Sequence, residues 1–156
     1  MRTLRIYLET TMFNYYFDTE REAHTDTVKL FEEIKAGKYQ AFTSVYAIRE
    51  LRDAPPDKMK KMLALVDEYG ITTLDFSTEA EQLAEIYVRE KIIPSKYGTD
   101  SVHIAVATIN DLDMILSLNF KHIVRKKTIE LTELINIREG YHRIGIYTPM
   151  EVVEHE

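Results

Sequence analysis

The sequence predicts an α/β fold with a mostly parallel central sheet and helices on both faces of that sheet. Short apolar runs alternate with longer segments whose apolar residues recur every three to four positions, as strands alternate with helices in this fold class. Glycine and proline are scarce, with 5 and 4 residues, so long unstructured linkers are not expected. The length of 156 residues suits one ordinary domain. We therefore expect a single domain over residues 1–156.

Five short apolar runs are the expected strands, at residues 3–8, 40–43, 71–74, 113–118 and 144–147. No apolar run approaches the roughly 20 residues of a membrane helix. The N-terminal residues lead directly into the first strand pattern, which does not resemble a signal peptide. The chain has no cysteine, which excludes disulfides and thiolate zinc sites. Together these features favour a cytoplasmic protein without membrane association.

Helices are expected between the strands, and several of their ends carry recognisable signals. The expected helices start near residue 11 and cover 25–37, 45–53, 56–70, 77–94, 99–109 and 128–138, with one or two further turns after residue 149. The expected start signals are a cap at Thr25-Asp26, caps at Ser44 and Ser77, a proline at the first helical position (Pro56), and a cap at Thr99 or Asp100.

Four oxygen-bearing side chains are placed where this fold class binds ligands. Glu9 and Asn119 directly follow the first and fourth expected strands. Ligands of open parallel sheets bind outside the carboxyl ends of the strands. Glu50 and Asp100 lie on expected helices that can reach the same edge. Clustered carboxylates suit a hard divalent cation such as Mg2+, which prefers oxygen ligands.

Each of these acids also has a simpler structural explanation. Glu9 can cap the short helix that follows it, and Asp100 can cap its own helix. Glu50 can be solvated or paired with a neighbouring arginine. His103 follows Asp100 by three residues on the same helical face, and we expect it to be a hydrogen-bonded structural residue rather than a metal ligand. The case for a functional site therefore depends on the occurrence of all four residues together at suitable positions, and not on any one of them.

The charge of the chain limits how it can bind nucleic acid. The chain has 26 acidic and 20 basic residues, and its net charge of -6 argues against a protein that binds nucleic acid through its overall electrostatic field. A local rim of basic residues around an acidic site is still compatible with this charge. The two basic clusters are Lys58, Lys60 and Lys61, and Lys121, His122, Arg125, Lys126 and Lys127. The first is expected to be solvated surface. The second follows Asn119, which favours contacts with phosphate.

Four segments, taken in order, carry a resemblance to a known family. They are residues 6–11, Thr43-Ser44 together with Glu50, residues 100–105 and residues 115–122. Each segment is short and degenerate, but their order and spacing over nearly the whole length are much more specific. The chain resembles the PIN-domain family of metal-dependent ribonucleases, which includes toxin subunits of type II toxin–antitoxin pairs. The resemblance implies a three-layer α/β/α sandwich.

Two positions depart from the pattern of that family. The first acidic position is usually Asp and is Glu9 here, which keeps the carboxylate on a longer arm. The fourth position is also usually Asp and is Asn119 here. An amide oxygen can still ligate a metal or hold a water, but it brings no charge. Three carboxylates remain, and we expect a branch of the family with a slightly weaker metal site.

The resemblance implies hydrolysis of RNA phosphodiester bonds. Glu9, Glu50 and Asp100 would hold one or two Mg2+ or Mn2+ ions, partly through waters. Asn119 completes the set of catalytic and metal-binding positions, where it would orient a ligand water or the scissile phosphate.

Supporting contacts are expected from residues that flank these positions. Thr10 and Thr11 could hydrogen-bond a carboxylate or a metal-bound water. Lys121 and Arg125 would contact the phosphates of the substrate. No Walker A loop or dinucleotide-binding glycine fingerprint is present in the sequence, so a nucleotide cofactor is not expected.

The expected partners are RNA, an antitoxin protein and a second copy of the chain. Residues Tyr15 to Phe17 are three consecutive aromatics that cannot all face one core, which favours a homodimer. Two other functions stay open. One is a non-catalytic PIN-like module that binds RNA or protein, which Asn119 makes a real alternative. The other is a metal phosphohydrolase that acts on other phosphoesters.

Overall fold

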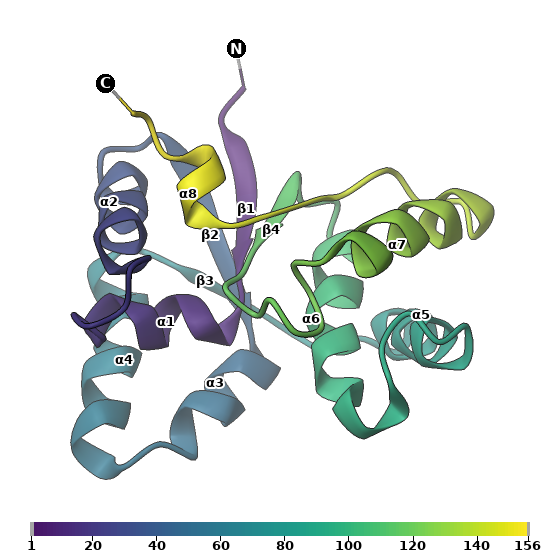
Figure 1. Ribbon diagram of the computed structural model, residues 1–156, viewed down its shortest axis with the longest axis horizontal. Helices are drawn as coiled ribbons and strands as arrows, with labels where there is room; N and C mark the ends of the chain where they lie inside the picture. Colours follow the sequence, from purple (N-terminus) through teal and green to yellow (C-terminus); the bar gives the residue numbers. More distant parts are fainter. Residues whose placement is uncertain (1, 156) are drawn as a thin grey trace.

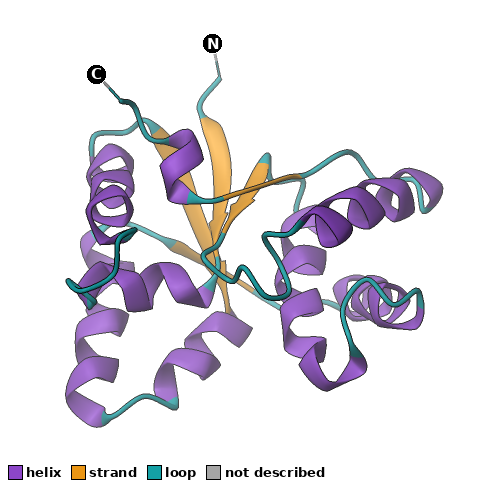
Figure 2. Cartoon of the chain, in the orientation of Figure 1, coloured by secondary structure: helices purple, strands orange, loops and turns teal. Residues whose placement is uncertain are grey.

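A five-stranded sheet with helices on both faces forms the centre of the computed structural model, which describes residues 2–155 (Figures 1 and 2). The strands are β1 (Leu4–Leu8), β2 (Tyr39–Ser44), β3 (Thr72–Leu74), β4 (Met114–Leu116) and β5 (Gly145–Tyr147). Their order in the sheet is β3-β2-β1-β4-β5, and all four neighbouring pairs are parallel. The predicted fold class is confirmed. The predicted domain limits, residues 1 and 156, lie outside the described residues.

The helices pack in two layers, one on each side of the sheet (Figure 1). They are α1 (Thr10–Phe17), α2 (His24–Lys35), α3 (Val45–Arg52), α4 (Pro56–Glu68), α5 (Thr78–Arg89), α6 (Gly98–Ile109), α7 (Lys126–Arg138) and α8 (Pro149–Val152), with a 3-10 turn at Ser95–Tyr97. Among residues 2–155, no helix is both long enough and apolar enough to cross a membrane.

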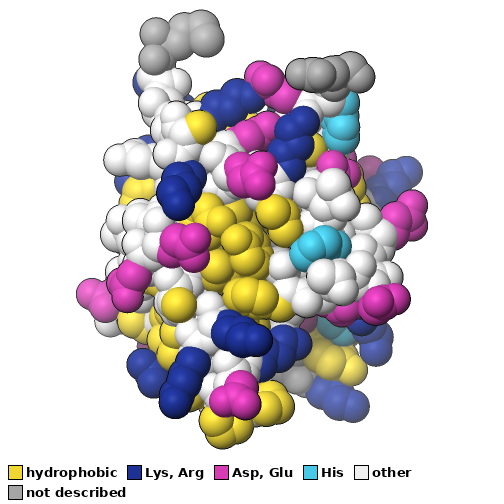
Figure 3. Space-filling model, turned by 90° about the vertical axis from the view of Figure 1, so that its left-hand side faces the viewer, with side chains coloured by type: hydrophobic (Ala, Val, Ile, Leu, Met, Phe, Trp, Pro, Cys, Tyr) yellow, Lys and Arg dark blue, Asp and Glu magenta, His cyan; other side chains and the backbone are white. Residues whose placement is uncertain are grey.

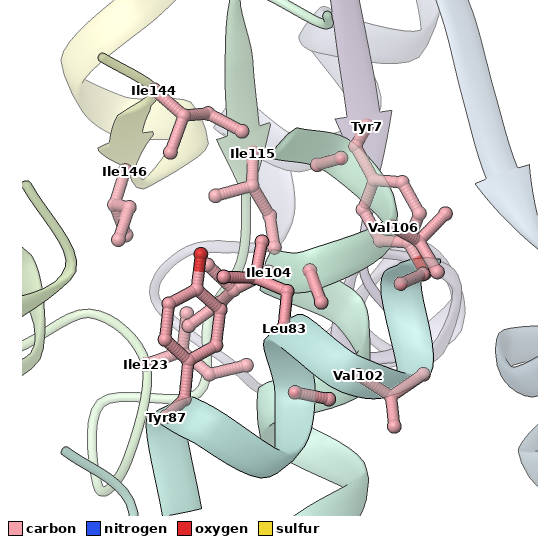
Figure 4. Packing of buried hydrophobic residues seen from close by; sticks show 14 of the residues in the cluster. Tyr7, Leu83, Tyr87, Val102, Ile104, Val106, Ile115, Ile123, Ile144 and Ile146 are labelled. Atoms are coloured by element: carbon pink, nitrogen blue, oxygen red, sulfur yellow. The ribbon is translucent and has the colours of Figure 1, made fainter. Parts of the chain in front are cut away.

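Two hydrophobic cores separate along the sheet because successive strand residues point to opposite faces. In β1, Tyr7 enters the core with α5, α6 and α7, whereas Ile6 and Leu8 enter the core with α1, α2, α3, α4 and α8. In β4, Ile115 and Leu116 divide in the same way. Figure 4 shows the first core, where side chains of α5 and α6 meet those of β1, β4 and β5. Both faces of the sheet are therefore covered by helices. The edge formed by the C-terminal ends of the strands remains available for a site.

Several predicted helix starts are confirmed. Ser44 and Ser77 cap α3 and α5, where their hydroxyl oxygens accept from the amides of Ala47 (3.2 Å) and Ala80 (3.1 Å). Pro56 occupies the first turn of α4, where its missing N–H costs no helical bond.

Two predicted caps are wrong. Helix α2 begins at His24 after Ala23, whose side chain cannot cap, so Thr25 and Asp26 lie inside its first turn. Helix α6 begins at Gly98, because the 3-10 turn before it already winds in the same sense and the chain continues into the helix. Asp100 is therefore the third residue of α6, where a negative charge still interacts favourably with the helix dipole.

The predicted extension of α5 to Pro94 is also wrong. The helix ends at Arg89, and Lys91 adopts a left-handed conformation with φ of 61°. The amide of Ile92 then bonds the carbonyl of Tyr87 at 3.1 Å, which closes the helix end in the manner of a Schellman motif. Ile92 is fully buried all the same, so its apolar character reflects the core beyond the helix.

Candidate functional site

Glu9 is a buried carboxylate at the point where β1 passes into α1. It is the N-cap of α1, and its Oε1 accepts from the amide of Thr11 (3.2 Å) and from the hydroxyls of Thr11 (2.5 Å) and Ser117 (2.7 Å). Burial raises the pKa of Glu9, against the lowering influence of His103 and of the hydroxyl donors. The simple interpretation as a helix cap is thus confirmed, and the cap is also an acid that is only 3% exposed.

The chain after β4 is tied to Glu9 by the same hydroxyl groups. The amide of Leu118 donates to Thr11 Oγ1 (2.7 Å), and the amide of Asn119 donates to Ser117 Oγ (2.9 Å). β4 ends at Leu116, two residues earlier than predicted. The amide of Ser117 still bonds the carbonyl of Tyr147 at 3.0 Å, but the next two amides bond side chains. These contacts bring Asn119 to the same edge of the sheet as Glu9.

Glu50 reaches this edge from α3, two turns after the Ser44 cap. Its Oε1 accepts from Thr10 Oγ1 at 2.8 Å and pairs with His103 Nε2 at 2.6 Å. Burial would raise the pKa of Glu50, but the hydrogen bond and charge of His103, together with Thr10, lower it below its ordinary value. The expected pairing of Glu50 with a neighbouring arginine is wrong: its partner is His103, and the guanidinium of Arg49 lies over the ring of Tyr46. The Glu50 side chain remains 33% exposed.

His103 links the carboxylates to the core. Its side chain is fully buried, and its Nδ1 lies 2.6 Å from the hydroxyl of Tyr7, which in turn lies 2.7 Å from Ser44 Oγ. The expectation of a hydrogen-bonded structural residue is confirmed. Burial alone would lower the pKa of His103, but its hydrogen bond to Glu50 and the charges of Glu9, Glu50 and Asp100 raise it. One imidazole thus lies in the field of three carboxylates.

Asp100 and Asn119 are the other two residues of the predicted site. Asp100 is 9% exposed, and burial raises its pKa. The charge of Glu50 acts in the same direction, whereas His103, His122 and the side chain of Asn119 lower the pKa. Asn119 Oδ1 accepts from the backbone amide of His122 at 3.0 Å, so one lone pair of this oxygen is already used within its own turn.

The four predicted positions thus come from four elements to one edge of the sheet, where Glu9, Glu50 and Asp100 lie near His103 and Asn119 lies near Asp100. Their donors are hard oxygens, which fit Mg2+ or Mn2+ in chemical type. No group of three or more His, Asp or Glu side chains within residues 2–155 is arranged as a ready-made metal site.

The predicted flanking residues have definite contacts. Thr10 and Thr11 each hydrogen-bond one of the carboxylates, Glu50 and Glu9 respectively. Lys121 Nζ lies 5.6 Å from the centre of the Tyr97 ring, one residue before the start of α6. Arg125 Nε donates to Thr128 Oγ1 at 3.2 Å at the start of α7. The contacts of Lys121 and Arg125 with a substrate remain predictions.

Sequence reasoning missed three hydroxyl residues of this network: Tyr7, Ser44 as a partner of Tyr7, and Ser117. Tyr7 carried a usable signal, since a tyrosine inside an apolar strand needs a buried hydrogen-bond partner for its hydroxyl. Ser117 is likewise a polar residue in an apolar run. Neither signal identifies the partner, which lies 96 residues away for Tyr7 and 108 for Ser117.

Comparison with known proteins gives matches among solved structures. No family model matches the chain, and no curated protein matches it. VapC20 of Mycobacterium tuberculosis, described as a sarcin-ricin loop cleaving toxin, aligns with a TM-score of 0.56 and 16% identity, over 70% of this chain and 86% of its own.

Two VapBC structures solved with DNA contain further similar chains. VapBC2 of Rickettsia felis, bound to a promoter fragment, aligns at 10% identity, and DNA-bound VapBC of Salmonella typhimurium aligns at 15%. Both have a TM-score of 0.56 and cover 92% of this chain and 98% of their own. At these identities the likeness establishes the fold: the chain has the three-layer PIN-domain fold.

Proposed function

We propose that this protein is a metal-dependent endoribonuclease that hydrolyses RNA phosphodiester bonds at an acidic Mg2+ or Mn2+ site. The observation that carries the proposal is the gathering of Glu9, Glu50 and Asp100 around the buried imidazole of His103. Three carboxylates kept together inside a fold at a cost in desolvation are typical of a functional site. The similar VapC20, described as cleaving the sarcin-ricin loop, supports RNA as the substrate.

Glu9, Glu50 and Asp100 would hold the cation, which when bound lowers the pKa of a water and neutralises charge on the phosphate. His103 and Thr10 both donate to Oε1 of Glu50, which fixes the carboxylate and directs its second oxygen away from them. Thr11 and Ser117 hold Glu9 in the same way. The hydroxyls and the imidazole therefore act as positioning groups.

The substrate would be bound by the chain that follows β4. Asn119, adjacent to Asp100, would orient a water or the scissile phosphate through the part of its amide that His122 leaves free. Lys121 and Arg125 would contact phosphates on either side. Because these contacts are between cations and phosphates, RNA binding should weaken as salt rises.

The biological role we propose is that of a toxin in a toxin–antitoxin pair, acting in the cytoplasm. Two of the similar structures are toxin–antitoxin complexes, which supports an antitoxin protein as a partner. We further propose a homodimer. Figure 3 shows hydrophobic side chains gathered near the centre of the face that carries α2 and α4. Leu134 and Ile137 of α7, on the other side of the molecule, are the most exposed large hydrophobic residues of the described part of the chain, and they form the dimer contact that we propose.

A non-catalytic module that binds RNA or protein is the second candidate, and Asn119 favours it. This residue brings no charge to the site, and its oxygen already accepts a backbone amide. Under this alternative the carboxylates around His103 would be structural. A metal phosphohydrolase acting on other phosphoesters is the remaining alternative from the sequence.

Cleavage assays separate the three functions. Purified protein is incubated with RNA, DNA and a small chromogenic phosphodiester, in Mg2+ or Mn2+ and with a chelator. We expect that RNA is the only one of the three substrates to be cleaved. This cleavage should be lost when the metal is chelated, and it should be lost in Asp100→Asn although the variant remains folded. Preference for DNA or for the small ester would indicate the phosphohydrolase. No cleavage of any substrate, with RNA still bound, would indicate the non-catalytic module.

A further inference from the structure

A cavity lies next to the chain segment that carries Asn119. Its volume is about 380 Å3, and its lining residues come from α1, from the start of α2 and the loop before it, from the chain after β4, and from α8. They are Tyr15, Arg21, Glu22, Ala23, Asp26, Phe120 and Met150. Nothing in the proposed reaction uses any of them. The volume is within the range of about 300–1,000 Å3 that is common for small-molecule sites.

Two of the lining residues connect this cavity to the carboxylates. Phe120 directly follows Asn119, so their Cα atoms are about 3.8 Å apart. Tyr15 lies four residues after Thr11 on α1, and residues at this spacing share one helical face. Thr11 is the residue whose hydroxyl holds Glu9. A nucleotide whose phosphate lies at Asn119 would therefore bring its base near this cavity.

The aromatic residues of the cavity offer surfaces for stacking. Phe120 is 52% exposed, and its ring has no aromatic partner within residues 2–155. On the other side, the guanidinium of Arg21 lies 5.2 Å from the centre of the Tyr15 ring. Unpaired bases of RNA commonly stack on aromatic rings and on arginine planes. An exposed phenylalanine close to a phosphate-binding position is consistent with that use.

The charged residues of the cavity define which base would fit. Glu22 and Asp26 form no ion pair with any other residue in the described part of the chain. Carboxylates read base edges by accepting N–H donors. Guanine presents adjacent imino and amino donors on one edge, which a carboxylate can accept together. Uracil has a single such donor, and adenine has only its amino group.

We propose that this cavity binds a guanine base next to the scissile phosphate, with the ring stacked on Phe120 and Tyr15 and its N–H edge on Asp26 and Glu22. This inference rests on the proposed ribonuclease function, to which it adds the class of substrate. It gives the enzyme a preference for cleaving RNA beside guanosine.

Binding of nucleoside monophosphates tests the base site without any cleavage. The full-length protein is titrated with guanosine, inosine, adenosine and uridine 5′-monophosphates, and the aromatic resonances of Phe120 and Tyr15 are followed by NMR. We expect guanosine monophosphate to shift both resonances. Inosine monophosphate, which lacks the amino group, should bind about tenfold more weakly, since a bidentate base contact contributes about 1–3 kcal/mol to discrimination.

Variants locate the contact. Combining Glu22→Gln with Asp26→Asn should weaken guanosine monophosphate binding by about tenfold or more, and Phe120→Ala should weaken binding of all four nucleotides. Glu32→Gln, which changes an acid of α2 outside the cavity, is the matched control and should bind as wild type does. Mapping the ends of cleaved RNA should show a guanosine preference in wild type that the double variant loses.

The outcomes separate the base site from the proposed function. If wild type binds guanosine monophosphate selectively but cleaves no RNA, the ribonuclease proposal falls and the base site stands. If wild type cleaves RNA but does not distinguish the four nucleotides, the base site is overturned and the ribonuclease proposal stands. Unchanged selectivity in the double variant would also overturn the base site.

Discussion

At the scale of single residues, the hydrogen-bonded chain Tyr7–His103–Glu50 is the feature that most distinguishes the site from ordinary core. Both Tyr7 and His103 are fully buried, and each contact in the chain is 2.6 Å long. Buried polar groups stabilise a fold only while every partner is present. These hydrogen bonds therefore make the position of the Glu50 side chain depend on Tyr7 of β1 and His103 of α6.

Replacing His103 should reveal this dependence. In His103→Leu, the Tyr7 hydroxyl and Glu50 Oε1 each lose a partner, and we expect the free energy of unfolding to fall by about 2–3 kcal/mol. Tyr7→Phe removes one hydroxyl and should cost about 1 kcal/mol. Urea denaturation of both variants and of the double variant gives the coupling energy. Additive losses would show that the two residues do not act as one network.

At the scale of elements, Ser44 connects the start of α3 to this network, and Ser77 provides a matched comparison. Each serine caps a helix, but Ser44 Oγ also contacts the Tyr7 hydroxyl. Ser77→Ala should cost about 1 kcal/mol of stability, as a lost cap usually does. Ser44→Ala should cost about 2 kcal/mol, since a further buried hydrogen bond is lost. Equal losses in thermal or urea denaturation would argue against the second role of Ser44.

The opposite edge of the sheet provides a test of pH dependence. Asp113 accepts from Arg2 Nη1 (2.9 Å) and from the backbone amide of Arg5 (2.8 Å), which ties the start of β4 to β1. The hydrogen bond from Arg2 lowers the pKa of Asp113, with further lowering by Arg5, and burial opposes both.

Because the folded pKa is depressed, this carboxylate stabilises the fold above its unfolded pKa of about 3.9 and ceases to do so as pH falls through the folded value. Asp113→Asn should therefore be less stable than wild type near pH 6, and the difference should shrink below about pH 4. Arg2→Ala should reproduce part of the effect. A difference that stays constant from pH 6 to pH 3 would contradict this account.

At the scale of the whole molecule, the proposed homodimer is tested through exposed apolar surface. The three consecutive aromatic residues 15–17 all have partners within the chain. The ring of Tyr15 lies near the guanidinium of Arg21, Tyr16 bonds the Tyr69 hydroxyl at 2.7 Å, and Phe17 packs on Tyr16. The row is partly exposed but no longer requires an external partner. Two residues of α7 are more exposed, Leu134 at 64% and Ile137 at 61%.

Light scattering at micromolar and higher concentrations should report a dimer for wild type. Combining Leu134→Lys with Ile137→Lys should produce a monomer, since two charges would be buried in an apolar contact. Glu68→Lys, which changes an exposed acid of α4 away from this face of α7, is the control and should remain dimeric. A monomeric wild type would contradict the proposal, and a dimeric double variant would place the interface elsewhere.

The fold could be predicted from the sequence because its signals are local. All five strands, the parallel sheet and the caps at Ser44 and Ser77 follow from periodicity and from the residues at helix ends. The wrong caps of α2 and α6 arose where the preceding turn, rather than a side chain, starts the helix. Lys91 could not be predicted to end α5, because a lysine in a left-handed conformation gives no sequence signal.

The candidate site could be predicted only in outline. Residues at strand ends such as Glu9 and Asn119 can be placed by topology alone, since parallel strands share a carboxyl edge. The partners of Glu50 could not be predicted, because His103 lies 53 residues away and meets it only after β1, α3 and α6 have packed together. For the same reason, no local pattern shows that the Asn119 oxygen accepts the amide of His122.

The central claim is that Glu9, Glu50 and Asp100 together form one divalent-cation site. A crystal soaked in Mn2+ tests this claim most directly. We expect anomalous density among the three side chains, with carboxylate oxygens or bridging waters about 2 Å from the metal. The same soak of Asp100→Asn should show weaker density or none. Well-ordered carboxylates without a manganese peak between them, or a peak elsewhere with unchanged RNA cleavage, would contradict the account.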